Sequence, residues 1–566
     1  MHKVKNIYNK YFFKNGKAFT EDYVVVRRIR VTYITNVAEY DLRKYFRKFG
    51  AFEQFEITDE SETDRYKKLY TCYICFVEPE AACRALLIEN HLVDKKRIFV
   101  EPVHSWQQPD KDKACNPMAE GQEEHENVVD PKAALNILKL PEYCIEAILE
   151  QMKPGDQIRL SRTHKGFRYI FEAFCRREIK KFDLDEMRTM TLWEIRDFLE
   201  ITGKYLVKIS GSINHKFREE IVDLLSKHCT NLKSVTLKDM IGMKAECLNN
   251  FLRLLPDLQE LNVTRCAMND KSIKILTAKK KLHSLHLYDV AKITGAQFKH
   301  LLQLEHLSLH DCYQVLEQNI RCICKSLTNL RTLDIRGIDL ELCPNFFQEM
   351  STLCQKLEVL KTTAIDDKNE NVALLPGLKH LEIVYSQPNK RLTVLPKLVQ
   401  HKANQLEILK IYSRQCLTVE HIKKISRLAK LKTLSIAFSG DALSNLGLAQ
   451  LGQLKQLEDL TIAGSDKVTN EGLLGLLRTC PKLHTLNIQF CKQITNDFLT
   501  EVIYMARFRG RKFTISTYGT SVVESAIVEC PSYQYVTRRS LLDVEFEFKE
   551  VGLEDFEDVF VPTESL

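Results

Sequence analysis

The sequence lacks several features that would assign it to a catalytic or membrane class. No run within its 566 residues approaches the roughly 20 consecutive apolar residues that a membrane-spanning helix needs. No apolar leader follows residues 1–5, and no glycine-rich phosphate loop, paired-carboxylate motif or Cys–His arrangement stands in a supporting context. We therefore expect a cytoplasmic or nuclear protein that is not an enzyme, needs no cofactor and does not bind a membrane.

Cysteine is not scarce, but its pattern does not fit a disulfide framework. The 18 cysteines are dispersed, and Cys266, Cys312 and Cys491 share one position of a repeat, where a small buried side chain fits. We interpret them as reduced core residues. A zinc site near several histidines is disfavoured, because Cys322 and Cys324 lie two apart on a predicted helix and diverge. No metal site is predicted.

Length and charge indicate several domains with distinct ends. A chain of 566 residues exceeds the size at which one core keeps growing. The whole chain has a net charge of +7, yet residues 541–566 carry nine acidic residues against one lysine. Residues 1–21 hold five lysines interleaved with aromatic residues. We expect a basic arm and an acidic tail, both solvated and mobile.

The dominant pattern is a repeat that begins L-x-x-L-x-L and recurs every 21 to 28 residues. Each unit places leucines inward from a short strand, and stacked units share one core. This period is typical of a leucine-rich-repeat solenoid, and the pattern resembles the cysteine-containing subclass found in F-box receptors. Two looser copies precede it, near residues 182 and 207, so the solenoid is predicted over residues 176–530. The repeats start at Leu232, Leu258, Leu282, Leu304, Leu330, Leu357, Leu378, Leu406, Leu431, Leu457 and Leu483.

A short segment before the repeats carries a second motif. Residues 140–156 read LPEYCIEAILEQMKPGD, with apolar residues on one helical stripe and a proline at a helix start. The segment resembles an F-box, although Tyr143, Gln157 and Phe167 depart from that family's pattern. The alternative is a helical cap on the first repeat. The resemblance implies three helices over residues 134–175 that bind a Skp-type adaptor through Leu140, Pro141, Ile145, Ile148, Leu149, Met152 and Asp156.

Residues 22–103 show a βαββαβ rhythm that resembles an RNA-recognition motif, a ferredoxin-like fold. Strands are expected at 29–34, 52–57, 70–77 and 97–100, and helices at 41–50 and 79–88. Alternation leaves Arg30, Thr32, Thr71 and Tyr73 on the open sheet face. Base stacking needs flat side chains there, and only Tyr73 and the Arg30 guanidinium qualify. Acidic and basic residues also balance, so we favour a protein-interaction role and keep RNA binding through Arg30 and Tyr73 as the alternative.

The strands of the solenoid predict a stripe of aromatic and basic side chains on its concave side. Such residues have no place in the core, although a bland solvated face is the default for any solenoid. We hypothesise that the stripe binds an acidic or phosphorylated protein segment with apolar anchors. Its members are Tyr288, His310, Arg336, Lys361, Tyr385, Lys410, Tyr412, Phe438 and Phe490.

The combined pattern is similar to F-box leucine-rich-repeat proteins. That resemblance implies the substrate receptor of a Skp-cullin-F-box ubiquitin ligase, with an RNA-binding adaptor as the rival function. Residues 104–133 are expected to form a flexible linker and residues 531–566 an acidic tail. We further hypothesise that residues 544–548 add a strand to the last repeat, and that the rest of the tail competes with substrate.

Overall fold

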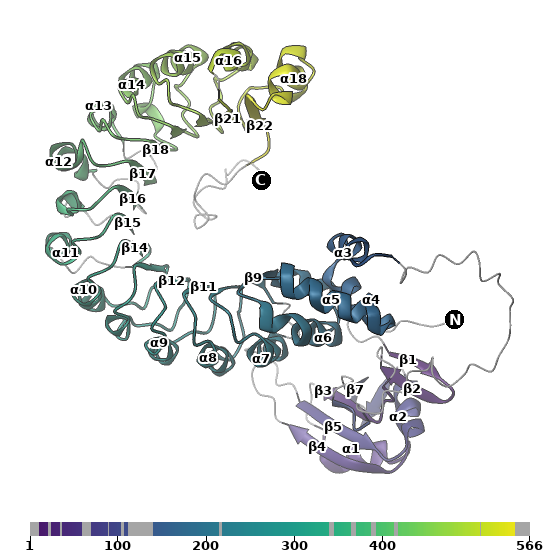
Figure 1. Cartoon of the computed structure of the whole chain (residues 1–566). Coiled ribbons are helices and arrows are strands. Elements are labelled where there is room, and N and C mark those ends of the chain that lie inside the picture. Colours follow the sequence, from purple (N-terminus) through teal and green to yellow (C-terminus); the bar gives the residue numbers. More distant parts are fainter. Residues whose placement is uncertain are drawn as a thin grey trace. The chain divides into compact units, whose positions relative to one another are not determined.

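The fold is seen in a computed structural model of the whole chain (Figure 1). The structure describes residues 11–20, 24–33, 37–58, 70–88, 90–94, 96–103, 107–110, 140–213, 218–338, 345–363, 369–385, 392–412, 417–509 and 511–548. Within these ranges no helix has the length and apolarity that crossing a membrane requires. The chain divides into two compact units, Met1–Tyr205 and Leu206–Leu566.

The first unit contains an antiparallel sheet with two helices between its strands. The strand order is β4-β5-β3-β7-β6, and the inward residues of β3 and β5 are buried as the alternation predicts. The short β6, which pairs with β7, was not predicted. The elements are β3 (Arg28–Tyr33), α1 (Glu39–Phe46), β4 (Phe52–Thr58), β5 (Tyr70–Phe76), α2 (Pro79–Leu86), β6 (His91–Val93) and β7 (Lys96–Pro102).

A hairpin precedes this sheet, formed by β1 (Tyr11–Lys14) and β2 (Lys17–Thr20). Its turn is Asn15-Gly16, and both residues have positive φ, 50° and 76°, as the favoured two-residue hairpin turn requires. Ala18 is fully buried in the hydrophobic core of the sheet. The prediction that residues 1–21 form a mobile arm is therefore wrong for residues 11–20, because their aromatic residues and Asn-Gly turn specify a hairpin.

Part of the predicted flexible linker is also fixed to this sheet. The buried Gln108 side chain accepts hydrogen bonds from the backbone N–H groups of Arg27 and Arg28, at 2.9 and 2.8 Å. Its amide nitrogen donates to the carbonyl oxygens of Arg28 and Val103. Asp110 pairs with the Arg27 guanidinium at 3.2 Å. The linker prediction is therefore wrong for residues 107–110, because one glutamine satisfies four backbone groups at the strand ends.

Three short helices follow in the first unit, as the F-box resemblance implies. They bury a common apolar core that includes Ile158, Phe171 and Phe174. A small strand forms where the first loose repeat copy was predicted, and a further helix begins with a Thr191–Glu194 capping box. The elements are α3 (Glu142–Glu150), α4 (Pro154–Thr163), α5 (Lys165–Glu178), β8 (Lys181–Asp183), η4 (Leu184–Thr189), α6 (Leu192–Thr202) and η5 (Gly203–Tyr205).

The second unit is a parallel sheet in which every strand pairs with the strand of the next repeat. Figure 1 shows these strands on the inner side of an arc and the helices on its outer side. The leucine-rich-repeat prediction is confirmed. The strands are β9 (Lys208–Ser212), β10 (Ser234–Lys238), β11 (Glu260–Thr264), β12 (Ser284–Tyr288), β13 (His306–His310), β14 (Thr332–Ile335), β15 (Val359–Thr363), β16 (His380–Val384), β17 (Ile408–Tyr412), β18 (Thr433–Ser435), β19 (Asp459–Thr461), β20 (Thr485–Asn487), β21 (Phe513–Ser516) and β22 (Leu542–Glu545).

Repeat length decides what forms the return limb between strands. The two shortest repeats, which start at Leu282 and Leu357, have only a 3₁₀ turn there. Longer repeats have an α-helix with its apolar face toward the leucines. The limbs are α7 (Arg218–His228), α8 (Ala245–Arg253), α9 (Asp270–Leu276), η7 (Phe298–His300), α10 (Glu317–Ser326), α11 (Phe346–Leu353), η8 (Asn369–Leu374), α12 (Val394–Lys402), α13 (Val419–Ile425), α14 (Asn445–Leu451), α15 (Asn470–Thr479), α16 (Asn496–Arg509) and, after β21, α17 (Glu524–Val528) and α18 (Pro531–Arg538).

The inward positions form one apolar core along the stack. Leucines of successive strands are fully buried, and Thr362 occupies one inward position with its hydroxyl donating to the Thr363 carbonyl oxygen at 3.0 Å. The predicted core cysteines are buried thiols, and those of Cys312 and Cys491 donate to carbonyl oxygens of the preceding repeat. Burial raises the pKa of the Cys266 thiol to about 12, as expected of an unreactive core cysteine.

The solenoid ends later than predicted. α18 and β22 build a further unit, and β22 pairs in parallel with β21. The predicted boundary at residue 530 and the prediction of a solvated tail from residue 531 are therefore wrong up to Glu545. The strand expected at residues 544–548 does form, but it spans Leu542–Glu545. Residues 549–566 lie outside the described residues.

Strand pairing also aligns a residue just after the end of each strand. At this position the backbone is left-handed in many repeats, with φ between 49° and 76°. We call this set the left-handed column. The first members are charged, whereas the last alternate between phenylalanine and glycine, and each phenylalanine ring lies over the glycine of the next repeat. The members are Asp239, Arg265, Asp289, Asp311, Gly337, Phe438, Gly464, Phe490 and Gly519.

Gly519→Ala should destabilise the solenoid by about 2 kcal/mol, because an added Cβ meets the Phe490 ring at 2.6 Å and φ is +71°. Gly475→Ala, in the interior of α15 with open space around it, is the matched control and should be neutral or stabilising by about 0.5 kcal/mol. Urea unfolding followed by circular dichroism measures both. An equal effect of the two substitutions would show that ring stacking does not need the glycine.

Candidate functional site

The predicted adaptor-binding residues lie on two sides of α3 and just before it. Leu140 and Ile148 are each 36% exposed, and Pro141 is also exposed. Ile145 and Leu149 are 2% and 1% exposed, because they pack into the three-helix core. The prediction that these two side chains contact an adaptor is therefore wrong, and they hold the helix in place instead.

Sequence reasoning missed one exposed residue on this surface. Tyr143, read only as a departure from the F-box pattern, is 71% exposed on α3. It stands about one turn before Ala147, which is also exposed, so it adds an aromatic ring to the exposed side of the helix. The helical spacing of 143 and 147, one turn apart, would have revealed it. We call Leu140, Pro141, Tyr143 and Ile148 the α3 face.

The remaining predicted adaptor residues have internal partners or partial cover. Met152 is half-buried. Asp156 accepts a hydrogen bond from Arg159 at 2.8 Å, and Arg159 also donates to the buried Glu194 at 2.6 Å. The Glu194 carboxylate raises the pKa of Arg159. The buried Gln157 donates to the Leu149 carbonyl oxygen at 2.8 Å, which explains how glutamine fits where the family has an apolar residue.

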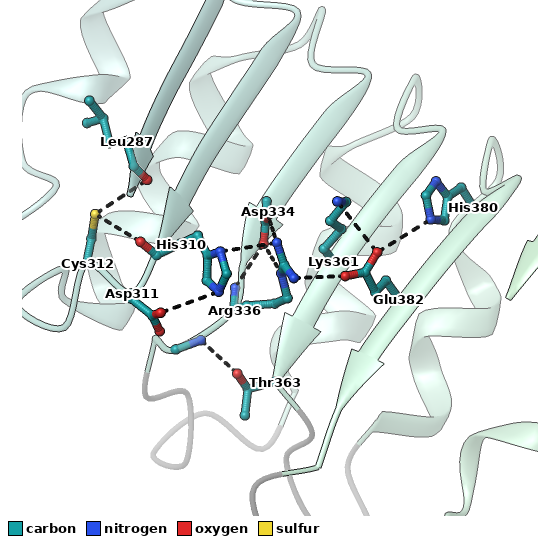
Figure 2. Close-up of polar contacts among 11 residues, drawn as sticks. Leu287, His310, Asp311, Cys312, Asp334, Arg336, Lys361, Thr363, His380 and Glu382 are labelled. Atoms are coloured by element: carbon teal, nitrogen blue, oxygen red, sulfur yellow. Dashed lines mark hydrogen bonds and ion pairs between the residues drawn. The ribbon is translucent and has the colours of Figure 1, made fainter. Parts of the chain in front are cut away.

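The most connected cluster of the solenoid lies on its concave side, across β13 to β16. Figure 2 shows Arg336 between two buried carboxylates, Asp334 and Glu382. Arg336 donates to Asp334 at 3.0 and 2.8 Å and to Glu382 at 2.9 Å. It also lies 3.1 Å from His310 Nδ1. The predicted phosphate-binding arginine therefore has its donors committed to the protein's own side chains.

The electrostatics of this cluster favour ionised carboxylates and a neutral histidine. Burial opposes ionisation of Asp334, but hydrogen bonds from Arg336 hold its pKa below the ordinary value. Glu382 also faces Lys361 at 3.5 Å and His380 at 3.8 Å. Burial, together with the charges of lysines and the arginine, lowers the pKa of His380 to about 4. His380 is thus uncharged at neutral pH.

The predicted substrate stripe consists of three parallel columns rather than one. The members of the first two columns lie at equivalent positions along the strands. Those of the third column lie just after the strands end. Tyr385 and Tyr412 are buried, whereas Lys410 is half-buried and has no ion pair among the described side chains. The columns contain Lys361 and Lys410; Tyr288, His310, Arg336 and Tyr412; and Tyr385, Phe438 and Phe490.

Aromatic rings meet at the last repeats of the concave side. The Phe438 and Phe490 centroids are 6.3 Å apart. Phe548, which follows β22, lies 6.2 Å from Phe490 and 5.6 Å from Tyr518. The end of the described chain thus contacts a predicted substrate residue. Competition between residues 549–566 and substrate stays a prediction, because those residues lie outside the described part of the chain.

The sheet of the first unit has its predicted RNA-binding groups paired internally. Arg30 forms an ion pair with Glu101, at 2.9 Å from its Nε. Arg28 lies over the Tyr73 ring at 5.4 Å from its centroid. Thr71 is 1% exposed, so it is covered and is not available to RNA. This surface presents a carboxylate beside its arginine, which is unfavourable for phosphate.

The histidines near the concave cluster serve as polar partners. His286 Nε2 lies 2.9 Å from the Ser284 hydroxyl, and His306 Nδ1 lies 2.9 Å from the Thr332 hydroxyl. Cys322 is exposed and Cys324 is buried, so their side chains diverge as predicted. Across the part of the chain that the structure describes, no three histidine, cysteine or acidic side chains are placed to hold a metal ion.

The comparison with protein families identifies the three-helix segment. The model of the F-box domain matches residues 137–178, which include α3, α4 and α5. These residues are an F-box domain. The chain therefore joins an F-box domain to a leucine-rich-repeat solenoid.

Two curated relatives match parts of this chain. F-box/LRR-repeat protein 4 of Bos taurus is 25% identical over 195 residues, which are 28% of this chain and 31% of that protein. A Caenorhabditis elegans protein named as an RNA-binding protein, EEED8.10, is 21% identical over 414 residues, 65% of this chain and 52% of that protein. The matches thus span about a third and a half of the relatives' lengths.

Solved structures are similar to the chain at low identity. The yeast Rad7–Elc1 complex matches with a TM-score of 0.41 and 15% identity, over 68% of this chain and 94% of that chain. An internalin, inlF, of Listeria monocytogenes matches with a TM-score of 0.32 and 16% identity, over 64% of this chain and 90% of that chain. Neither likeness bears on function.

Arg336→Met should destabilise the solenoid by about 3 kcal/mol, because it leaves two buried carboxylates without their arginine. Arg331→Met is the matched control, since its ion pairs with Glu305 and Glu358 are exposed and contribute about 1 kcal/mol or less. Thermal and urea unfolding of the full chain measure both variants. Similar losses in the two would contradict a structural role for Arg336.

Proposed function

We propose that the protein is the substrate-recognition subunit of a Skp-cullin-F-box ubiquitin ligase. The F-box domain docks to a Skp-type adaptor, and the solenoid holds a protein substrate for ubiquitination and proteasomal degradation. The chain itself performs no chemistry in this role. The observation that carries the proposal is an F-box domain with an exposed apolar α3 face, followed in the same chain by a solenoid of parallel repeats.

The α3 face supports adaptor binding through its composition. Leucine, proline, isoleucine and tyrosine side chains are exposed on a segment whose Ile145 and Leu149 side chains are buried. Contiguous exposed apolar groups rimmed by polar residues are typical of protein interfaces. The acidic residues Glu142 and Glu150 flank this face on the same helix. An apolar groove with polar edges on the adaptor would complement it.

The concave side supports substrate binding through basic and aromatic side chains that lie outside its charged cluster. Arg336 is committed to carboxylates, so we move the proposed recognition of acidic or phosphorylated segments to Lys410. Lys361 lies two strands away in the same column, across Glu382. Phe438 and Phe490 provide apolar contacts just after β18 and β20, one and three strands beyond the β17 strand of Lys410. Neighbouring strands lie about 4.8 Å apart, so an extended peptide of several residues spans this distance.

A variant with Leu140→Ala and Ile148→Asp should lose adaptor capture. Removing central apolar anchors costs about 2 kcal/mol or more, which is roughly a 30-fold loss of affinity. Co-expression with a Skp-type adaptor and affinity purification measure it. The control is Leu446→Asp, at an exposed leucine of α14 in the solenoid. A wild-type chain that captures no adaptor would disprove the proposed function.

Lys410→Glu should weaken substrate capture at least about tenfold while adaptor capture stays intact, because the substitution reverses a concave-side charge that forms no ion pair with any described residue. The control is Lys299→Glu, at an exposed lysine of η7 on the return limb. Proteins that accumulate when the chain is depleted supply the substrates, and their co-purification with each variant is the readout. Equal capture by Lys410→Glu and wild type would place recognition elsewhere.

The rival function is an RNA-binding adaptor that uses the βαββαβ module of residues 22–103, which we propose to be a degenerate RNA-recognition motif. Its strand order and helices support that fold. The Arg30–Glu101 and Arg28–Tyr73 contacts favour a protein-binding role. Crosslinking to RNA that is lost in Arg30→Ala with Tyr73→Ala would favour the rival.

A further inference from the structure

The last helices of the solenoid carry an exposed cluster of aromatic and basic side chains. On α16, Tyr504 and Phe508 are 61% and 74% exposed, and their rings lie 5.3 Å apart. Arg507, between them in sequence, is exposed as well. Figure 1 shows α18 beside α16 at this end of the arc. We use the name end patch for six residues of this region: Tyr504, Arg507, Phe508, Tyr535, Arg538 and Arg539.

Two guanidinium groups converge on one exposed ring in this patch. Arg507 from α16 lies 5.2 Å from the Tyr535 centroid, and Arg539, which follows α18, lies 4.6 Å from it. The two charges are therefore closer to each other than the ~10 Å over which salt screens exposed charges. Like charges at this separation repel, and an anion bound between them would remove that cost.

The arginines of the end patch have no carboxylate partner among the described residues. Several arginines elsewhere are paired, for example Arg27 with Asp110 and Arg336 with Glu382. One acid, Glu501, lies a turn before Tyr504 on α16, and it pairs with none of these arginines. The patch thus combines positive charges that form no ion pair among the described residues with exposed flat rings.

We propose that the end patch binds single-stranded nucleic acid. The arginines, held over the Tyr535 ring, would contact phosphates, and Tyr504 and Phe508 would stack on bases, which is the combination that sequence-tolerant single-strand binding uses. An acidic peptide would satisfy the guanidinium groups but would leave the exposed rings of Tyr504 and Phe508 without a role. Nucleic acid is therefore favoured over an acidic protein segment. None of the residues of the end patch belongs to the βαββαβ module or to the α3 face.

The test uses the full chain and fluorescein-labelled 20-nucleotide single strands of mixed sequence, RNA and DNA, in anisotropy titrations between 50 and 200 mM KCl. We expect binding of at least one strand type that weakens as salt rises. Arg507→Gln with Arg539→Gln should reduce the slope of log affinity against log salt by about 1.4, because each single-strand phosphate contact contributes about 0.7. Tyr535→Ala should weaken binding on the order of 5-fold.

The matched control is Arg427→Gln with Arg478→Gln, which removes the same charge from exposed arginines of two other repeats. Circular dichroism confirms that each variant is folded. No binding at 50 mM KCl, or equal loss in the control, would overturn the proposal. Loss only in Arg30→Ala with Tyr73→Ala would overturn it in favour of the N-terminal module. Binding of a peptide of residues 549–566 without binding of either nucleic acid would identify an acidic protein segment as the ligand instead.

Discussion

The pairing of parallel strands in one unbroken register is the constraint on which the solenoid depends. Each strand meets the next at the same position, as Val235 with Leu261 and Leu285 with Leu307 illustrate, so the inward residues of successive repeats are apolar together. A shift by one residue would turn the leucines outward and the charged residues inward. The same register brings Asp334, Lys361 and Glu382, which are far apart in sequence, onto neighbouring strands.

How much of this could be predicted from the sequence differs between the core and the concave surface. The leucine period predicts the strands, their order and the buried positions, because burial selects apolar residues at fixed spacing. The pairing of Arg336 with Asp334 and Glu382 does not follow from the sequence, since Glu382 lies 46 residues away and meets Arg336 only through the strand register. This register turns a predicted ligand-binding arginine into a residue that neutralises its neighbours.

In the first unit, too, the sequence predicts some features and not others, but for a different reason. Alternation and helical spacing predicted the strands and helices of the sheet and the three F-box helices. The hairpin at residues 11–20 and the attachment of Gln108 were not predicted, because they depend on a single Asn-Gly turn and on one hydrogen-bonding side chain, which leave no trace in the composition. The apolar stripe of α3 was read as one set, but a helix that packs on its neighbours buries Ile145 and Leu149 and exposes Ile148.

The alternation of phenylalanine and glycine in the left-handed column sets a unit of two repeats at the end of the solenoid. Phe438 with Gly464, and Phe490 with Gly519, each form one ring-and-gap pair across neighbouring strands. Loss or gain of a single repeat there would place two phenylalanine rings, or two glycines, at this position of neighbouring repeats. Gain or loss of two repeats would keep the pattern, so this part of the chain can change in length only in double steps without repacking its inner rim.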